Sequence, residues 1–163
     1  MGEVLAHFSA RIDASTILAE LKLEARKFVV ASFHREENVD NPRNLSAIVD
    51  AIDQVCKAHG VTAVVSTHPR TKKRLTEFGI AQPKSLQFLK PFGFHDYNKL
   101  QKSALCTISD SGTISEESSI LGFPAVTIRN ALERPEALDS GAIILTGLEA
   151  GAILRGVNLA ISE

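Results

Sequence analysis

The stretch Ile108-Ser-Asp-Ser-Gly-Thr-Ile-Ser-Glu-Glu-Ser-Ser-Ile-Leu-Gly-Phe-Pro124 decides the fold, because it joins a strand, a turn and a helix without a gap. The apolar run 105–108 predicts a buried strand, and the small polar residues 109–112 predict a turn. A helical pattern follows and ends at Gly122, shortly before Pro124. Such a junction directs unpaired backbone N–H groups and the positive end of the helix dipole at an anion.

The side chains of this junction suit a nucleotide. Ser111 and Thr113 can add hydroxyl donors, and Gly112 lets the backbone approach a ligand closely. Glu116 and Glu117 lie one turn into the helix, where a carboxylate would repel phosphate but can accept hydrogen bonds from ribose hydroxyls. An ordinary strand–helix turn with a serine cap has the same pattern, because strand–Ser/Gly–helix is far less specific than a Walker loop.

Apolar strands and amphipathic helices alternate along the rest of the chain. The expected strands cover residues 27–33, 62–66, 86–89, 105–108, 125–128 and 142–145. The expected helices are a short one that ends at Leu23 after a cap at Asp13 or Ser15, then 42–59, 69–78, 95–103, one that ends at Gly122, and 148–161. Parallel strands need such crossovers, and right-handed crossovers build a doubly wound sheet. The sequence therefore predicts an α/β, Rossmann-like parallel sheet in a single domain over residues 1–163.

The composition is that of a soluble globular domain, with 163 residues, 44% hydrophobic and 23% charged. The net charge of −1 gives no reason to expect nucleic acid or an anionic membrane as a partner. No apolar run approaches the roughly 20 residues of a membrane span, and Met1–Val4 lacks a signal-peptide layout. Cys56 and Cys106 lack metal-site or redox spacing, which favours a reduced, cytoplasmic chain.

Polar clusters follow the predicted strands, at the positions where parallel sheets bind ligands. These clusters cover residues 34–38, 68–70, 92–97, 109–117 and 129–136. His34 can donate to a phosphate or act as an acid or base, and Arg35 can bind a phosphate through two hydrogen bonds. His68 and Arg70 repeat this arrangement one unit later. For both pairs, hydrogen bonds to the neighbouring turn are the structural alternative.

The loop Phe92–Tyr97 offers aromatic rings and free backbone groups, which suit a planar base, although the aromatics could instead be core residues. Arg134 lies in a later loop at the same predicted edge and could face a diphosphate. No G-x-G-x-x-G follows the first strand, and no residues have metal-ligand spacing, so neither a dinucleotide, nor a metal, nor another cofactor is predicted. The clusters together indicate a nucleotide-diphosphate site, with nucleotide sugars as the natural ligands.

Four motifs extend across nearly the whole chain: His34-Arg-Glu-Glu-Asn38, Asp110-Ser-Gly-Thr-Ile-Ser-Glu-Glu117, Leu121-Gly-Phe-Pro124 and Glu133-Arg-Pro-Glu-Ala137. In order and spacing they resemble the non-hydrolysing UDP-N-acetylglucosamine 2-epimerase family. Enzymes of this family have two Rossmann-like domains around a cleft, the GT-B arrangement, and this chain resembles the carboxyl-terminal one. The resemblance implies a missing amino-terminal domain, a UDP-sugar substrate and a homodimer as the full-length enzyme.

The resemblance also implies roles for individual residues. His34 and Arg134 would meet the diphosphate, Ser111, Gly112 and Thr113 would cradle it, Glu117 would take the ribose hydroxyls, and Tyr97 and the backbone near Phe92 would bind uracil. In the family a second UDP-sugar can bind as an activator, and Arg35, His68 and Arg70 are the candidates for that effector site. The common family motif has arginine where this chain has Glu36, which puts any phosphate contact there in doubt.

The implied reaction is an isomerisation at C2 of a UDP-2-acetamido sugar by elimination and re-addition of UDP. The proton-transfer carboxylates of the family lie in the other domain. No catalytic base is therefore predicted in this chain, which is expected to be inactive alone, and His34 is a candidate stabiliser of the leaving group.

Longer motifs resemble one branch of the family, which makes UDP-N-acetyl-L-fucosamine for capsule and O-antigen. They are His34-Arg-Glu-Glu-Asn-Val-Asp40, Ser66-Thr-His-Pro-Arg-Thr71 and Phe88-Leu-Lys-Pro-Phe-Gly-Phe94. The alternatives are the UDP-sugar-binding half of a GT-B glycosyltransferase and a non-catalytic nucleotide-binding module. The motif Glu133-Arg-Pro-Glu136 favours the epimerase.

Overall fold

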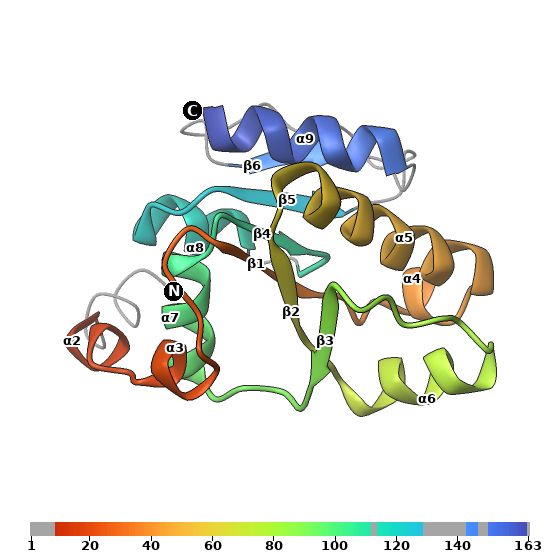
Figure 1. Ribbon diagram of the computed structural model, residues 1–163, viewed down its shortest axis with the longest axis horizontal. Helices are drawn as coiled ribbons and strands as arrows, with labels where there is room; N and C mark the ends of the chain where they lie inside the picture. The colour runs from red at the N-terminus through yellow and green to blue at the C-terminus, as the bar shows by residue number, and fades with distance from the viewer. Residues whose placement is uncertain (1–8, 112–113, 129–142, 147–149, 163) are drawn as a thin grey trace.

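The computed structural model describes residues 9–111, 114–128, 143–146 and 150–162, which form one parallel sheet with helices on both faces (Figure 1). The sheet has six strands in the order β3-β2-β1-β4-β5-β6. Their bounds are β1 Phe28–Ser32, β2 Thr62–Ser66, β3 Leu86–Leu89, β4 Cys106–Ser109, β5 Ala125–Ile128 and β6 Ile143–Thr146. Every neighbouring pair is parallel, and the order reverses between β1 and β4. The predicted Rossmann-like fold is confirmed.

Helices cover both faces of this sheet (Figure 1). One face holds α5 Pro42–His59, α6 Pro69–Glu77 and α9 Ala150–Ser162, and the other holds α3 Ile17–Glu20, α7 Phe94–Ser103 and α8 Ile114–Leu121. Successive residues of β1 serve the two layers in turn, because side chains alternate along a strand. Val29 packs in the core cluster that contains α5 and α9 residues, and Val30 packs with Leu100 of α7. Burial on both faces explains why the strand sequences are almost continuously apolar.

Local signals at both ends define α5, as predicted. Asn41 Oδ1 accepts the N–H groups of Arg43 at 2.9 Å and Asn44 at 3.2 Å, and Pro42 occupies the first helical position. Gly60 ends the helix in the left-handed conformation, with φ 66°. The buried face of α5 includes Leu45, Ile48, Val49, Ile52, Val55 and Cys56.

The segment before β1 differs from the prediction. The expected helix to Leu23 is wrong, because the chain forms α2 Ser9–Asp13 and the one-turn α3, and then turns at Lys22 with φ 57°. Ser15 still helps to start α3, since its Oγ accepts the N–H of Ile17 at 3.2 Å. Leu18, Leu21 and Leu23 pack against the core cluster that contains Val30 and Leu100, even without a continuous helix.

The predicted loop 34–38 also differs, because it runs into a one-turn helix, α4 Glu36–Val39. Asn38 and Val39 are buried, and this burial holds the turn against the core. The other element bounds agree with the prediction to within about two residues, the usual uncertainty of helix ends. Among the described helices, none is long and apolar enough to cross a membrane.

Polar contacts attach the first segment to α7. Lys102 Nζ lies 2.6 Å from Asp13 Oδ1, and Ser15 Oγ donates to Asp96 Oδ1 at 2.6 Å. The hydrogen bond from Lys102 holds the pKa of Asp13 below its ordinary value. The start of α7, which carries the aromatic loop, is thereby joined to residues that precede β1.

Candidate functional site

A cavity of about 270 Å³ opens at the carboxyl ends of β1, β2 and β4. Its polar and aromatic lining comes from strand ends, from the start of α7 and from the region of α8. The lining includes Ser32, His34, Ser66, Phe92, Phe94, Tyr97, Asn98, Gln101, Ser109, Ser111 and Glu117. A second cavity of about 210 Å³ shares Ser32, His34 and Ser66, so His34 borders both. This is the sheet edge at which parallel α/β folds bind ligands, beside the reversal of strand order.

Hydroxyl groups replace apolar side chains where the central strands reach the cavity. Ser32 pairs with Ser109 in the ladder, and Ser109 pairs in turn with Thr127. Ser66 follows Val65, the ladder partner of the residue before Ser32, so it extends the same row. The Oγ atoms of Ser32 and Ser109 lie 3.2 Å apart. Ser32, Ser66 and Ser109 of this row line the cavity. Because hydroxyls both donate and accept, they give it a floor suited to a polar ligand.

Tyr97 forms one wall of the cavity and also part of the core. It packs against the cluster that contains Phe28, Val30 and Leu100, and its phenol oxygen lies 2.8 Å from Ser32 Oγ. Burial raises the pKa of Tyr97 to about 12, although the hydrogen bond with Ser32 opposes the rise. The phenol therefore stays protonated at neutral pH. The core interpretation of the aromatic loop therefore holds for Tyr97, and its place in the cavity wall keeps the base contact as a prediction.

Asp110 connects the loop after β1 with the turn after β4, and sequence reasoning did not single it out. Its carboxylate is fully buried and accepts three N–H groups at 2.9 Å, from the backbones of His34 and Arg35 and from Asn38 Nδ2. His34 Nδ1 lies 3.3 Å from Asp110 Oδ1. The signal was available, because a carboxylate directly after a buried strand must find donors nearby.

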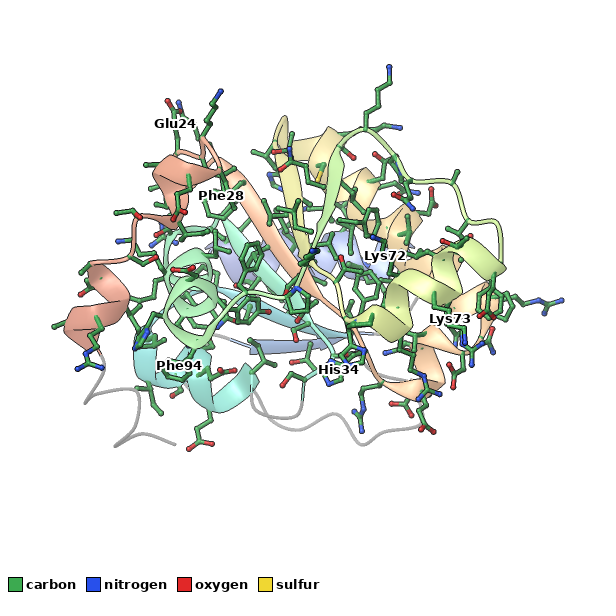
Figure 2. All side chains as sticks on the ribbon, turned by 90° about the horizontal axis from the view of Figure 1, so that it is seen from below. Glu24, Phe28, His34, Lys72, Lys73 and Phe94 are labelled. Carbon is green, nitrogen blue, oxygen red and sulfur yellow. The ribbon has the colours of Figure 1, made fainter. Side chains whose placement is uncertain are left out.

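The predicted residues that the structure describes are brought together. Figure 2 shows His34 and Phe94 at one edge of the sheet, with Phe28 at the opposite end of β1. His34, Phe92, Tyr97, Ser111 and Glu117 all line the larger cavity. The side chain of His34 is 54% exposed, which leaves it accessible to a ligand. The predicted residues Gly112, Thr113 and Arg134 lie outside the described residues, as does Glu133-Arg-Pro-Glu-Ala137.

Arg70, a candidate effector residue, is already paired with carboxylates. Its Nη2 bonds Asp40 Oδ2, its Nε lies 3.1 Å from Asp40 Oδ1, and its Nη1 lies 3.6 Å from Glu36. The hydrogen bond from Arg70, with a further one from Arg74, holds the pKa of Asp40 below its ordinary value. Glu36 is thus part of a group of ion pairs that joins α4 to α6.

The other two effector candidates also have partners. Arg35 Nε lies 3.0 Å from Glu37 Oε1. His68 caps α6, and its Nδ1 accepts the N–H of Arg70 at 3.1 Å. The structural alternative, hydrogen bonding to the neighbouring turn, therefore holds for His68. Within the described part of the chain, no cluster of His, Cys, Asp or Glu is placed to hold a metal ion.

A doubly wound sheet with a polar cavity at its topological switch point defines the class of Rossmann-like ligand-binding domains. The sequence matches the profile of one family of that class, described as UDP-N-acetylglucosamine 2-epimerase, over residues 1–163. The chain belongs to this family.

Individual relatives agree with this assignment. The UDP-N-acetylglucosamine 2-epimerase of Methanocaldococcus jannaschii is 34% identical over 140 residues, which cover 83% of this chain and 38% of that protein. A crystal structure of the UDP-GlcNAc 2-epimerase of that organism, in complex with UDP-GlcNAc and UDP, has a TM-score of 0.87 at 29% identity and covers 99% of this chain and 46% of its own. The epimerase structure from Rickettsia bellii has a TM-score of 0.79 at 38% identity, with 99% and 43% covered. The chain therefore spans less than half the length of the relatives it matches.

Proposed function

We propose that this chain is the carboxyl-terminal, UDP-binding half of an enzyme of the UDP-N-acetylglucosamine 2-epimerase family with the two-domain GT-B arrangement. The observation that carries the proposal is the cavity at the ends of β1, β2 and β4, which places His34, Tyr97 and Glu117 around one space. The bound UDP of the Methanocaldococcus jannaschii relative supports the same ligand. The full-length enzyme is proposed to be a homodimer.

In this proposal the diphosphate lies at the start of α8. Helix N-termini bind phosphate through free backbone N–H groups, and Ser111 lines the cavity just before the helix. His34 approaches from the loop after β1, and Gly112, Thr113 and Arg134 are proposed to complete the diphosphate site. The positive charge of an arginine, together with N–H donors in a partly enclosed site, suits a group with two negative phosphates.

The nucleoside is proposed to extend from the diphosphate along the other walls. Glu117, one turn into α8, accepts hydrogen bonds from the ribose hydroxyls, as an ionised carboxylate can. Uracil lies between Tyr97 and the backbone at Phe92, where a ring and main-chain groups adjoin the cavity. Arg35, His68 and Arg70 are proposed to lie near a further, effector UDP-sugar and to position its neighbours, because each already has a protein partner.

The reaction proposed for the full-length enzyme inverts C2. A carboxylate takes the C2 proton, the electron pair forms a C1–C2 double bond, and the C1–oxygen bond breaks as UDP leaves. UDP then returns to C1 while a proton is delivered to the opposite face of C2. Since C2 is weakly acidic, the growing charge on the diphosphate must be stabilised, which His34, Arg134 and the N-terminus of α8 are proposed to do. The carboxylates belong to the other half.

The substrate proposed is a UDP-2-acetamido-2,6-dideoxyhexose, which would give UDP-N-acetyl-L-fucosamine for capsule or O-antigen. The motifs 34–40, 66–71 and 88–94 support this choice. The test compares turnover of UDP-GlcNAc and of the 6-deoxy-talose analogue by the full-length protein. A preference for UDP-GlcNAc would refute the substrate and leave the family assignment intact. Sugar transfer to an acceptor without C2 inversion would indicate a glycosyltransferase instead.

Calorimetric titration of the 163-residue chain tests the binding site. Affinity should fall from UDP to UMP to uridine, because the diphosphate carries most of the charge. Glu117→Gln should weaken UDP but leave 2′,3′-dideoxy-UDP almost unchanged, and Glu116→Gln is the matched control on the same helix turn. Equal affinities for UDP and uridine would contradict the diphosphate assignment.

A further inference from the structure

Asp110 holds both the backbone and the ring of His34. Asp110 Oδ2 accepts the backbone N–H of His34 at 2.9 Å, the backbone N–H of Arg35 at 2.9 Å and Asn38 Nδ2 at 2.9 Å. Asp110 Oδ1 lies 3.3 Å from Nδ1 of the His34 imidazole. The carboxylate is fully buried, whereas the imidazole is 54% exposed and borders both cavities. A buried acceptor thus lies close to one ring nitrogen of a partly exposed residue that lines the ligand space.

The short distance between Asp110 Oδ1 and His34 Nδ1 bears on which ring nitrogen carries hydrogen. A neutral imidazole has one N–H, and its position is set by the hydrogen bond that the ring makes. A carboxylate that accepts three N–H groups acts as an acceptor. A lone pair on Nδ1 would therefore lie close to the lone pairs of Asp110 Oδ1 and be repelled, whereas an N–H there would be attracted to that oxygen. The arrangement favours the Nδ1–H tautomer, the reverse of the tautomer that a free histidine side chain prefers.

The same carboxylate joins two parts of the site that are distant in sequence. His34 follows β1, and Asp110 follows β4 immediately before Ser111, at the turn into α8. The two loops lie side by side because β1 and β4 are paired, with Ser32 opposite Ser109. Asp110 therefore fixes the position of His34 relative to the start of α8, where a bound group would lie.

We propose that Asp110 is the positioning residue for His34, accepting its Nδ1–H and leaving Nε2 as the nitrogen that meets the diphosphate. The second part of this inference rests on the proposed function, whereas the tautomer does not. Asp110 touches no substrate in this arrangement and acts only through the imidazole. A purely structural aspartate would stabilise the loop but would have no effect on the tautomer.

Nitrogen-15 NMR of the histidine rings tests the first part without any ligand. Spectra of the labelled chain at about pH 8.5, where an ordinary histidine is neutral, distinguish the two tautomers by their ring nitrogen shifts. His34→Gln identifies the His34 signals among the five histidines. We expect the Nδ1–H tautomer for His34. Predominance of the Nε2–H tautomer in the wild type would overturn the proposal whatever the variants do.

Two variants then separate positioning from stability. Asp110→Asn presents an amide N–H₂ where the carboxylate was, so His34 should change to the Nε2–H tautomer and UDP affinity should fall about tenfold to a hundredfold. Asn38→Ala removes one donor to the same carboxylate without touching His34, and should lower stability while leaving the tautomer and UDP affinity close to wild type. If Asn38→Ala weakened UDP as much as Asp110→Asn, the role would be structural and the proposal wrong.

The measurement of UDP binding tests the proposed function separately from the tautomer. A wild-type chain with the Nδ1–H tautomer but no UDP binding would refute the nucleotide site and leave the Asp110–His34 contact established. Circular dichroism checks that Asp110→Asn folds. If it does not, the wild-type tautomer and Asn38→Ala decide the question.

Discussion

The phenol oxygen of Tyr97 lies 2.8 Å from Oγ of Ser32, which joins the first turn of α7 to the last residue of β1 across 65 positions of sequence. The contact lies where the core meets the cavity, because Ser32 and Tyr97 both line that space. The Tyr97 side chain thus fixes the start of α7, which forms one wall of the cavity, relative to the row of hydroxyls that begins with Ser32.

Two substitutions at Tyr97 should separate its hydrogen bond from its ring. Tyr97→Phe keeps the ring and should cost about 1 kcal/mol of unfolding free energy, the usual contribution of one hydrogen bond. Tyr97→Ala also removes the packing against Phe28 and Leu100 and should cost roughly 3 kcal/mol. Denaturant unfolding measures both. If Tyr97 flanks uracil, Tyr97→Ala weakens UDP and uridine alike, and a loss confined to UDP would contradict that contact.

Asp40 should make the stability of the fold depend on acid pH. Hydrogen bonds from Arg70 and Arg74 lower its pKa in the folded chain below the ordinary value of 3.8. A lowered folded pKa means that the contribution is present above pH 3.8 and is lost as the pH falls through the folded pKa. Asp40→Asn should therefore be less stable than wild type at neutral pH, and the difference should disappear on acidification.

Unfolding experiments from about pH 6 down to about pH 2 measure this convergence of the two stability curves. Lys72→Gln is the control, because it removes an exposed charge from α6 without altering the pair with Asp40. Parallel curves for wild type and Asp40→Asn over the whole range would contradict the role of Asp40.

Gly60 should be intolerant of a side chain for a conformational reason alone. A Cβ at this position meets no atom within 4 Å, yet the residue has φ 66°. Gly60→Ala should therefore cost about 1–2 kcal/mol of unfolding free energy, and Gly60→Asn less. Gly93 is the matched control, because its φ is −70° and the space around it is equally open. Equal losses at both positions would show that the left-handed backbone is not the cause.

The two thiols should be unreactive in the folded chain. Burial raises the pKa of Cys56 to about 11 and that of Cys106 to about 12, so little thiolate is present at neutral pH. A thiol reagent at about pH 8 should modify both residues only as fast as the chain opens, and rapidly in denaturant. Ser119→Cys, at an exposed position of α8, provides the reactive control. Fast modification of Cys106 under native conditions would contradict its burial.

Local patterns predicted most of the fold. Asn41, Pro42 and Gly60 define α5 through contacts within a few residues, and the continuous apolar strands identify a sheet covered on both faces. The helix expected up to Leu23 failed because its apolar residues reach the core through a turn at Lys22 instead, which periodicity does not reveal. Tertiary packing overrode propensity there.

The site was predictable to the extent that it depends on strand ends. His34, Ser111 and Glu117 share a cavity because parallel strands end at one edge, a rule that needs no coordinates. The hydroxyl row and the identity of the donors that meet the Asp110 carboxylate depend on the register between strands far apart in sequence. That register is a property of the assembled sheet, so single-residue patterns could not give it.

The strand order also has a consequence for synthesis on the ribosome. β2 can pair with β1 as soon as residue 66 has emerged, but β4, on the other side of β1, ends only at Ser109. During the roughly 2–9 s needed to add the intervening residues, at about 5–20 residues per second, β1 has an open parallel edge in the nascent chain. Open edges recruit strands from other molecules. Chains whose synthesis stops before Cys106 keep that edge permanently, which makes them aggregation-prone products of interrupted translation.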